Sequence, residues 1–380
     1  MNVLAGGEGG YTLVSILPIR AALFPLLDTR EACALRGVCQ ELKQAVADFP
    51  WEDLGTVIRG SIASWRACFP RAIGANVGQR AMAWNSVWDN PTGRHTPVVD
   101  ADFVHFVGLR ALNMSYCREV TDAAFAHLRG IERLNMTRCR QAALTDLAFA
   151  HLGGIRVLSM SGCDQATDAA FAHLAGIQEL DMSHCSKATD AAFAQLRGIH
   201  TLNMTYCYRI TSAAFEHLRG IQELDMSNCY QATITDAAFE HLAGVRKLSL
   251  RYCHQATISD AAFVHLKGIK VLNMGACWQL TDAVFEHLRG IHTLVMWGCL
   301  ITDAALVHLQ GIHTLDMEGC SKSSITEAGL GHLRGVKRLN MARCAPESIA
   351  AAESLGFPVA RRGWQHNKGP FDTSFVEREE

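Results

Sequence analysis

Residues 130–139 read GIERLNMTRC, and residues 167–176 read TDAAFAHLAG. They are the two halves of a unit that recurs along most of the chain. It is close to G-I-x-x-L-x-M-x-x-C, then two to five variable residues, then T-D-A-A-F-x-H-L-x-G. Eleven of the fourteen cysteines mark the unit, 21 to 24 residues apart, at positions 117, 139, 163, 185, 207, 229, 253, 277, 299, 320 and 344. A period in this range indicates a solenoid, in which each coil stacks on the next.

Each half of the unit predicts one element. The alternation of Leu134 and Met136 with polar residues predicts a short strand with one buried and one solvated face. After the cysteine, Thr or Ser before Asp is typical of a helix N-cap with an acid in the first turn. The A-A-F-x-H-L run then predicts about two helical turns, and the following glycine, such as Gly130, suits the residue after a helix.

The Cys, Met, Phe, Leu and Ile columns hardly change from unit to unit, which favours a stacked core. No Cys-x-x-Cys pair occurs, so the thiols are not expected to hold a metal. The chain shows no catalytic constellation and no phosphate-cradling glycine loop. We therefore predict a protein that is not an enzyme and that needs no cofactor.

The repeat resembles the cysteine-containing type of leucine-rich repeat, with its L-x-x-L-x-L-x-x-C and I-T-D signature, over about residues 98–344. The resemblance implies an α/β fold: a horseshoe-shaped leucine-rich repeat solenoid with parallel inner strands and short outer helices. Met replaces Leu at ten of the eleven second-strand positions and Phe replaces the usual helix Leu, which keeps both positions apolar.

Residues 13–51 contain amphipathic helical stretches, which predict a small α-helical module. The order of its apolar residues resembles an F-box, which docks a substrate receptor on the small adaptor subunit of a cullin-type ubiquitin ligase. The resemblance implies docking through Leu17, Pro18, Leu23, Phe24, Leu27, Val38, Cys39 and Trp51. The alternative is that the module only covers the open end of the solenoid, which repeat proteins require.

The expected organisation has five parts. A flexible start (1–10) precedes the F-box-like module (11–52), and an irregular cap or degenerate repeats (53–97) lead into the array (98–345). A C-terminal cap and tail (346–380) close it, with a helix over residues 349–355. Residues 99–109 are expected to supply the helix before the first clear strand.

Composition limits location and partners. Residues 13–27 are too short to span a bilayer, and no basic residue precedes them as in a signal peptide. We expect a cytoplasmic or nuclear protein with reduced thiols. With 35 basic and 37 acidic side chains the net charge is −2, which favours neither nucleic acid nor a membrane as partner.

The column of histidines near the helix ends favours a structural role, since a donor or cation is favourable there; a weak pH response is the alternative. It comprises His127, His151, His173, His217, His241, His265, His287, His308 and His332, with Gln195 as the exception.

Partner choice is expected at the positions that vary between units, which flank the cysteine. Aromatic residues gather there in the fifth to ninth units, with Arg251 as a charged anchor, and Tyr and Trp dominate the energetics of protein interfaces. This predicts a protein-binding edge of the concave face formed by Tyr206, Tyr208, Tyr230, Arg251, Tyr252, Trp278 and Trp297. Local packing over the loops is the alternative. A smaller basic spot, Arg118, Arg138 and Arg140, could receive an acidic or phosphorylated segment.

Together these observations and resemblances predict a recognition protein that presents a protein ligand to a ubiquitin ligase. A stand-alone binding scaffold or inhibitor is the alternative, and an extracellular receptor is less favoured because of the thiols.

Overall fold

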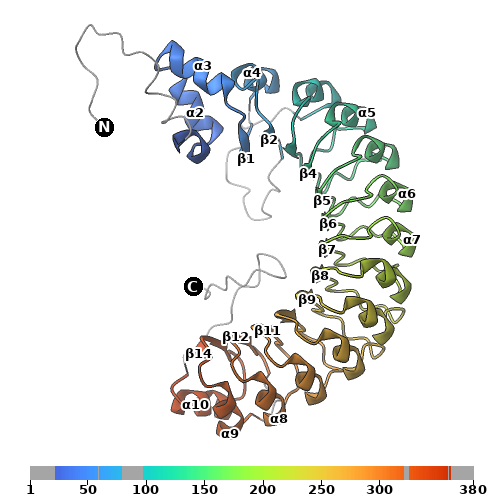
Figure 1. Cartoon of the computed structure of the whole chain (residues 1–380), viewed down its shortest axis with the longest axis vertical. Coiled ribbons are helices and arrows are strands. Elements are labelled where there is room, and N and C mark those ends of the chain that lie inside the picture. Colours follow the sequence, from blue (N-terminus) through green and yellow to red (C-terminus); the bar gives the residue numbers. More distant parts are fainter. Residues whose placement is uncertain (1–21, 59, 79–96, 321–324, 358, 361–380) are drawn as a thin grey trace, which may run out of the picture.

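The computed structural model describes residues 22–58, 60–78, 97–320, 325–357 and 359–360. These residues form a curved solenoid with a parallel sheet on the inside and short helices on the outside (Figure 1). The sheet runs through fourteen strands in sequence order, and each pairs in parallel with the next. Its strands are β1 Glu52–Val57, β2 Gly74–Asn76, β3 Ala111–Asn113, β4 Arg133–Asn135, β5 Val157–Ser159, β6 Glu179–Asp181, β7 Thr201–Asn203, β8 Glu223–Asp225, β9 Lys247–Ser249, β10 Val271–Asn273, β11 Thr293–Val295, β12 Thr314–Asp316, β13 Arg338–Asn340 and β14 Val359–Ala360.

The register keeps identical side chains on top of one another. Leu134 lies opposite Leu112 on one side and Leu158 on the other, and the same leucine column continues to Leu339. Cysteine, methionine and phenylalanine columns are buried beside it; Cys139, Met136 and Phe125 are no more than 1% exposed. The stacked core predicted from the repeat is therefore present.

The outer segments are shorter and tighter than the two α-helical turns that the sequence predicts. They begin as predicted: the Thr121 hydroxyl accepts a hydrogen bond from the Ala123 amide. Many then adopt 3-10 geometry, labelled η, because a run of six or seven residues closed by glycine leaves little room for α-helical hydrogen bonds. The segments are η3 Asp100–Phe106, α5 Asp122–Phe125, η4 Ala126–Leu128, η5 Asp146–His151, α6 Asp168–Phe171, α7 Asp190–Phe193, η6 Ser212–Leu218, η7 Asp236–Leu242, η8 Asp260–Leu266, η9 Asp282–Leu288, α8 Asp303–Leu306, η10 Val307–Leu309, α9 Glu327–Leu330 and η11 Gly331–Leu333.

A ladder of hydrogen bonds ties each outer segment to the next. The Asp122 carboxylate accepts bonds from the backbone amide and hydroxyl of Thr145, one repeat later, at 2.7 and 2.6 Å. Equivalent pairs recur from Asp100–Thr121 to Asp303–Thr326. Ser212 interrupts the series, because its hydroxyl oxygen accepts the Thr235 amide at 2.9 Å without a carboxylate. The T-D pair therefore links repeats as well as capping helices.

The N-terminal module covers the first strand of the sheet (Figure 1). It consists of η2 Phe24–Leu26, α2 Thr29–Leu35 and α3 Gln40–Asp48, and α4 Ile62–Cys68 follows β1. The Asp53 carboxylate accepts bonds from the amide and hydroxyl of Thr29, both at 2.8 Å, which fastens α2 to β1. The strand β1 thus joins module and sheet.

At the other end, α10 Pro346–Ser354 closes the solenoid. It begins three residues earlier than the sequence predicts, because Pro346 occupies the first turn, where its missing amide costs nothing. No helix in the described ranges is both long and apolar enough to cross a membrane.

Candidate functional site

Six aromatic rings form a continuous row along the loops that follow strands β6 to β10. Successive ring centroids are 4.4 to 6.1 Å apart in the order His184, Tyr206, Tyr208, Tyr230, His254 and Trp278. We call this row the aromatic ledge. Tyr208, Tyr230 and Trp278 are 41%, 49% and 53% exposed as residues, so each has surface left for a ligand.

The structure adds two histidines to the predicted surface. His184 stacks on Tyr206, and His254 bridges Tyr230 and Trp278. Both occupy the variable positions beside the cysteine, so the sequence contains their signal, but a prediction based on Tyr and Trp alone does not include histidine.

Arg251, Tyr252 and Trp297 form a second group, which we call the arginine cluster. The guanidinium of Arg251 lies 5.0 Å from the Tyr252 ring centroid and 5.5 Å from that of Trp297. The two rings meet edge to face at 5.1 Å. The His254 imidazole Nδ1 lies 2.9 Å from the Tyr252 carbonyl, which places the cluster next to the ledge.

Arg251 is held by rings and not by an acid. Its Nε has no hydrogen-bond partner within the described residues, and none of their carboxylates forms an ion pair with it. Because Nε is buried, the donors left for a ligand are those of the two terminal nitrogens, and a carboxylate can accept from both at once. The predicted anchor therefore has the chemistry to bind an acidic group of a ligand.

Glycine makes room for the cluster. A β-carbon at Gly275 would overlap the indole Nε1 of Trp297, which comes from the following repeat. The indole thereby crosses the eighth repeat and reaches Tyr252 of the seventh.

Several of these residues stand in a strained backbone conformation. The residue before each array cysteine has a positive φ; it is 62° for Tyr206, 62° for Tyr252 and 60° for His184. Glycine holds the same position at Gly162 and Gly298, with φ of 68° and 70°. A side chain in this left-handed region costs about 1 kcal/mol or more, so these aromatic residues are not the most stable choice for the fold.

The polar column of the inner strands has a structural explanation. The side-chain oxygen of Asn135 accepts the backbone amide of Thr137 at 3.0 Å, and Asp225 accepts that of Ser227 at 2.9 Å. The Asn and Asp residues of this column therefore satisfy the amide two residues on, where their strands end, whereas Val295 occupies the same position in β11 without such a bond. This reason differs from the solvation that the sequence suggests, and the column carries no signal for a partner.

The basic spot predicted at Arg118, Arg138 and Arg140 lies beside the ledge. The pKa of His184 is lowered by burial and by the positive charges of Arg138 and Arg140. Arg140 itself donates to the Gly162 carbonyl at 3.0 Å and lies 3.7 Å from Asp164. Arg118 is exposed, and no ion pair is found for it within the described residues.

The predicted docking residues do not form one surface. Leu17 and Pro18 lie outside the described residues. Phe24 and Trp51 are each 2% exposed and stack on one another at 5.3 Å, and the indole of Trp51 donates to the Val46 carbonyl. In this structure both side chains form the module's own core and are not exposed to a partner, so the docking prediction now concerns the exposed residues of the set. Leu27 is partly buried against that core, whereas Leu23, Val38 and Cys39 are exposed.

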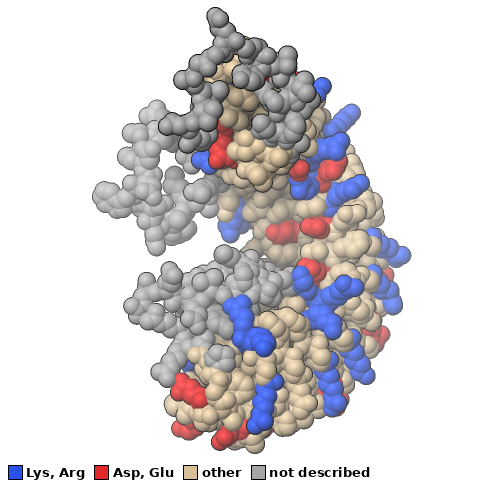
Figure 2. All heavy atoms as spheres, turned by 60° about the vertical axis from the view of Figure 1, so that its left-hand side comes forward, with Lys and Arg blue, Asp and Glu red and all other residues tan. Residues whose placement is uncertain are grey.

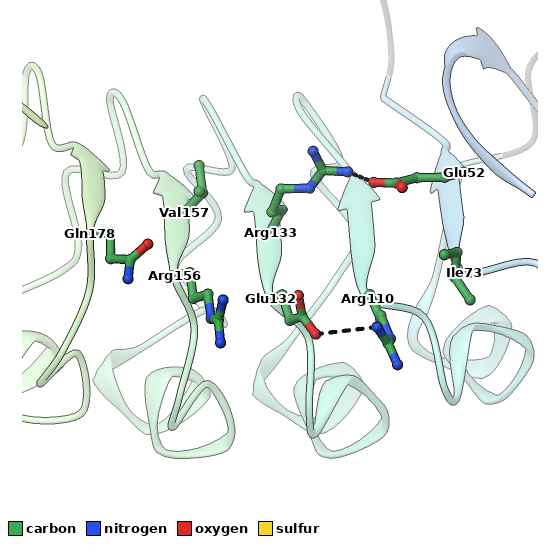
Figure 3. Close-up of a pocket in the computed structure, with 8 residues that line it drawn as sticks. All are labelled: Glu52, Ile73, Arg110, Glu132, Arg133, Arg156, Val157 and Gln178. Carbon is green, nitrogen blue, oxygen red and sulfur yellow. Dashed lines mark ion pairs between the residues drawn. The ribbon is translucent and has the colours of Figure 1, made fainter. Parts of the chain in front are cut away.

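A small pocket of about 310 Å³ opens at the start of strands β1 to β6 (Figure 3). Arg110 faces Glu132 at 3.8 Å, and Arg133 pairs with Glu52. Arg156 lines the same pocket, and no ion pair is found for it within the described residues. The remaining lining residues are Ile73, Val157 and Gln178.

The histidine column follows the outer segments. His217 and His287 each approach a neighbouring glutamate, at 3.2 and 3.1 Å. Within the described ranges, no three His, Cys, Asp or Glu side chains are placed to hold a metal ion.

No protein-family model matches the chain, and no curated protein matches it. Solved structures do. The crystal structure of the TLR13-ssRNA13 complex matches with a TM-score of 0.54 and 18% identity, over 72% of this chain and 39% of that one. The fold is a leucine-rich repeat solenoid. The Toll–Spatzle complex of Drosophila matches with a TM-score of 0.46 and 15% identity, over 65% of this chain and 42% of that one. This leucine-rich repeat chain thus spans about two fifths of the length of either.

Proposed function

We propose that this leucine-rich repeat protein is a recognition scaffold that binds a protein ligand on the aromatic ledge and the arginine cluster. The observation that carries the proposal is the continuous row of aromatic rings, in which Tyr208, Tyr230 and Trp278 are 41%, 49% and 53% exposed. The positive φ before the cysteine recurs in every repeat, also at Arg138 and Ala276, so it belongs to the repeat and does not mark a site. Glycine is accepted at the same position elsewhere in the array, so the fold itself does not require the rings of Tyr206 and Tyr252.

The composition of the surface supports a protein ligand. On binding, exposed Tyr and Trp side chains bury a large area at little cost in side-chain entropy. Arg251, which lies among these rings, can bind an acidic side chain of the ligand. The TLR13 structure is a complex with single-stranded RNA, so a related fold serves as a binding scaffold there.

The test compares two variants of the full chain. In the ledge variant, Tyr208→Ala and Tyr230→Ala remove two rings of the ledge and Trp297→Ala removes one ring of the arginine cluster. In the outer variant, Leu147→Ala, Val264→Ala and Val307→Ala remove exposed apolar side chains from outer segments. A photo-crosslinking residue at position 254, an exposed position between Tyr230 and Trp278 that neither variant changes, is placed in all three baits and should capture a protein from extracts of the source cells. With the wild type and the outer variant as bait the same protein should be recovered, and with the ledge variant it should be lost. Equal recovery with both variants would contradict the proposal.

A second candidate function is docking on the adaptor subunit of a cullin-type ligase, as the F-box resemblance implies. The exposed apolar side chains of the module favour it: Leu23, Leu26 and Val38 are 39%, 78% and 63% exposed. The contact of α2 with β1 through Asp53 favours the competing role of an end cap. Binding of the purified adaptor to the full chain, lost in Leu26→Asp with Val38→Asp, would support docking. If the folded wild-type chain does not bind the adaptor, the role of an end cap is the interpretation that remains for the module.

A further inference from the structure

The near-zero net charge conceals a separation of charge. Each repeat of the array enters its strand through five residues, which run from the position before the glycine to the first strand residue. In the eleven repeats these entry segments hold fourteen Lys or Arg and three Glu, an excess of eleven positive charges. The basic residues are Arg110, Arg129, Arg133, Arg156, Arg197, Arg219, Arg246, Lys247, Lys267, Lys270, Arg289, Arg334, Lys337 and Arg338. We call this side of the solenoid the basic edge.

These side chains reach solvent. All but Lys247 and Arg338 are exposed, and those two are half-buried. Figure 2 shows Lys and Arg side chains following one another down one side of the curved body, with fewer Asp and Glu among them. The three arginines of the pocket, Arg110, Arg133 and Arg156, belong to this edge.

Stability of the helices explains only part of this pattern. A cation before the glycine, such as Arg197 or Arg219, is favourable because it lies at a helix C-terminus. A second column, which includes Arg156, Arg246 and Lys270, begins the strands and gains nothing from a helix end. Arg246 and Lys270 are neighbours in this column and repel one another without a fold-level benefit, so a bound anion is the simpler explanation.

The chemistry of the edge favours phosphates over carboxylates on a protein. Ten of its fourteen basic residues are arginine, whose planar fork binds phosphate oxygens in pairs. Among the described residues, Val107 of the first entry segment is the one exposed large apolar side chain on the edge; the other exposed apolar side chains of the array are on the ledge, the loops or the outer helices. A protein partner needs apolar anchors, whereas a nucleic-acid backbone is bound mainly by charge.

The shape of the edge favours a single strand. The ten steps from β3 to β13 cover about 50 Å at the usual spacing of strands, so the excess charge is about one per 5 Å. A duplex carries about one negative charge per 1.7 Å of its axis and is stiff over about 50 nm, so it neither matches this density nor follows the curve. We propose that the basic edge binds single-stranded nucleic acid through its phosphates, without reading the base sequence.

The proposal differs from the function proposed for the ledge, which lies at the opposite ends of the strands. Acidic residues such as Asp164 and Asp181 accompany the arginines near the ledge. The prediction that nucleic acid is not a partner rested on the net charge of the whole chain. Because basic residues are concentrated on one edge, the net charge of the whole chain does not indicate which partner this edge can bind.

The test measures binding of fluorescent 20-nucleotide RNA and DNA strands of mixed sequence by anisotropy, between 50 and 200 mM salt. If five or more phosphates are neutralised, the slope of log K against log salt should be about −3.5 or steeper. Arg197→Glu, Arg219→Glu and Arg289→Glu together should lower the affinity at least about tenfold and flatten the slope by about 2, since each phosphate contact contributes about 0.7. The matching duplex should bind more weakly.

The control makes the same change of charge elsewhere. Lys43→Glu, Lys187→Glu and Arg209→Glu alter exposed residues outside the basic edge and should keep the affinity within about twofold, the usual range for unrelated surface changes. No binding at 50 mM salt, or equal losses in both variants, would overturn the proposal. So would loss of RNA binding in the ledge variant alone, or binding of poly-glutamate or phosphatidylserine vesicles in preference to both nucleic acids.

Discussion

The indole of Trp297 lies directly over Gly275, at a distance that leaves no room for a β-carbon. Gly275→Ala should therefore displace the indole from Tyr252 and open the arginine cluster. We expect the affinity for a ledge ligand to fall at least about tenfold, the cost of losing one aromatic anchor of about 1.4 kcal/mol.

Tryptophan fluorescence would detect the displaced indole, and calorimetry with the captured ligand would measure the affinity. Gly153→Ala is the matched control, because a β-carbon there meets nothing within 4 Å. If the indole does not move in Gly275→Ala, the backbone around position 275 must shift to make room for the β-carbon, which would contradict this prediction.

Position 206 separates stability from binding. Glycine relieves the strain of the left-handed backbone, and alanine retains it. The free energy of unfolding of Tyr206→Gly should therefore exceed that of Tyr206→Ala by about 1 kcal/mol. This order is the reverse of the usual one, in which glycine is the weaker residue. Both variants lose the stack on His184 and should lose ligand binding alike. Urea titrations of the two variants check the order, and a more stable alanine variant would refute it.

The interrupted ladder at Ser212 can be repaired. Ser212→Asp should supply the carboxylate that Thr235 lacks and raise the free energy of unfolding by about 1 kcal/mol, because bonds to a charged group exceed those to a hydroxyl. Asp282→Ser makes the opposite change at a complete rung and should lower it by a similar amount. Chemical denaturation of the three proteins measures both. If the free energy of unfolding changed in the same direction in both variants, the carboxylate of the rung would not be what stabilises the joint.

Burial governs the reactivity of the thiols. It raises the pKa of Cys117, Cys139 and Cys229 to about 12, so these thiols hold their protons at neutral pH. Iodoacetamide should label the exposed Cys39 rapidly in the native protein. Cys33 should react more slowly, because partial burial raises its pKa as well, and the half-buried Cys68 should also react slowly. The eleven array cysteines should react only after unfolding, as peptide mass spectrometry would show. Early labelling of an array cysteine would locate a repeat that opens.

Burial also raises the pKa of Asp225, although the bonds it accepts from Ser227 act in the other direction. An acid whose pKa is higher in the folded chain than its ordinary 3.8 destabilises the fold once it ionises. The penalty is absent below pH 3.8 and is complete above the folded pKa. Asp225→Asn keeps the oxygen that accepts the Ser227 amide, as Asn203 does for Thr205.

The variant should therefore melt at a higher temperature than the wild type at pH 7, and the gap should narrow as the pH falls towards 4. Calorimetry at four or five pH values would follow it. A gap that is constant with pH would mean that ionisation of Asp225 is not its source.

Periodicity made the solenoid predictable, because each repeat meets only its neighbours and a column of identical residues must stack. Leu134, Met136 and Cys139 could be placed in the core from their spacing alone. The module was harder to predict: Phe24 and Trp51 match a docking motif in order, and only the packing of one ring on the other shows that they face inward.

The candidate site was predicted in outline. The variable positions identified Tyr208, Tyr230 and Trp278, but not the crossing of Trp297 over Gly275, which depends on the absence of a side chain in the neighbouring repeat. The left-handed backbone at Tyr206 was not predicted either, because tyrosine does not indicate it. Gly162 and Gly298, at the same position of other repeats, are the signal in the sequence that favours it. The basic edge was not predicted, because the net charge sums basic and acidic side chains that the fold places on different parts of the surface.

The rung at Ser212 is built differently from its neighbours. The Ser212 hydroxyl accepts the Thr235 amide, the Ser212 amide donates to the Thr233 carbonyl at 3.1 Å, and the Thr233 hydroxyl donates to the Ile210 carbonyl at 3.2 Å. On the inner side the same two repeats carry Tyr208 and Tyr230, whose ring centroids are 5.3 Å apart. The bonds on the convex side of the horseshoe therefore help to set the spacing of two ligand-facing rings on its other side, with no loop between them.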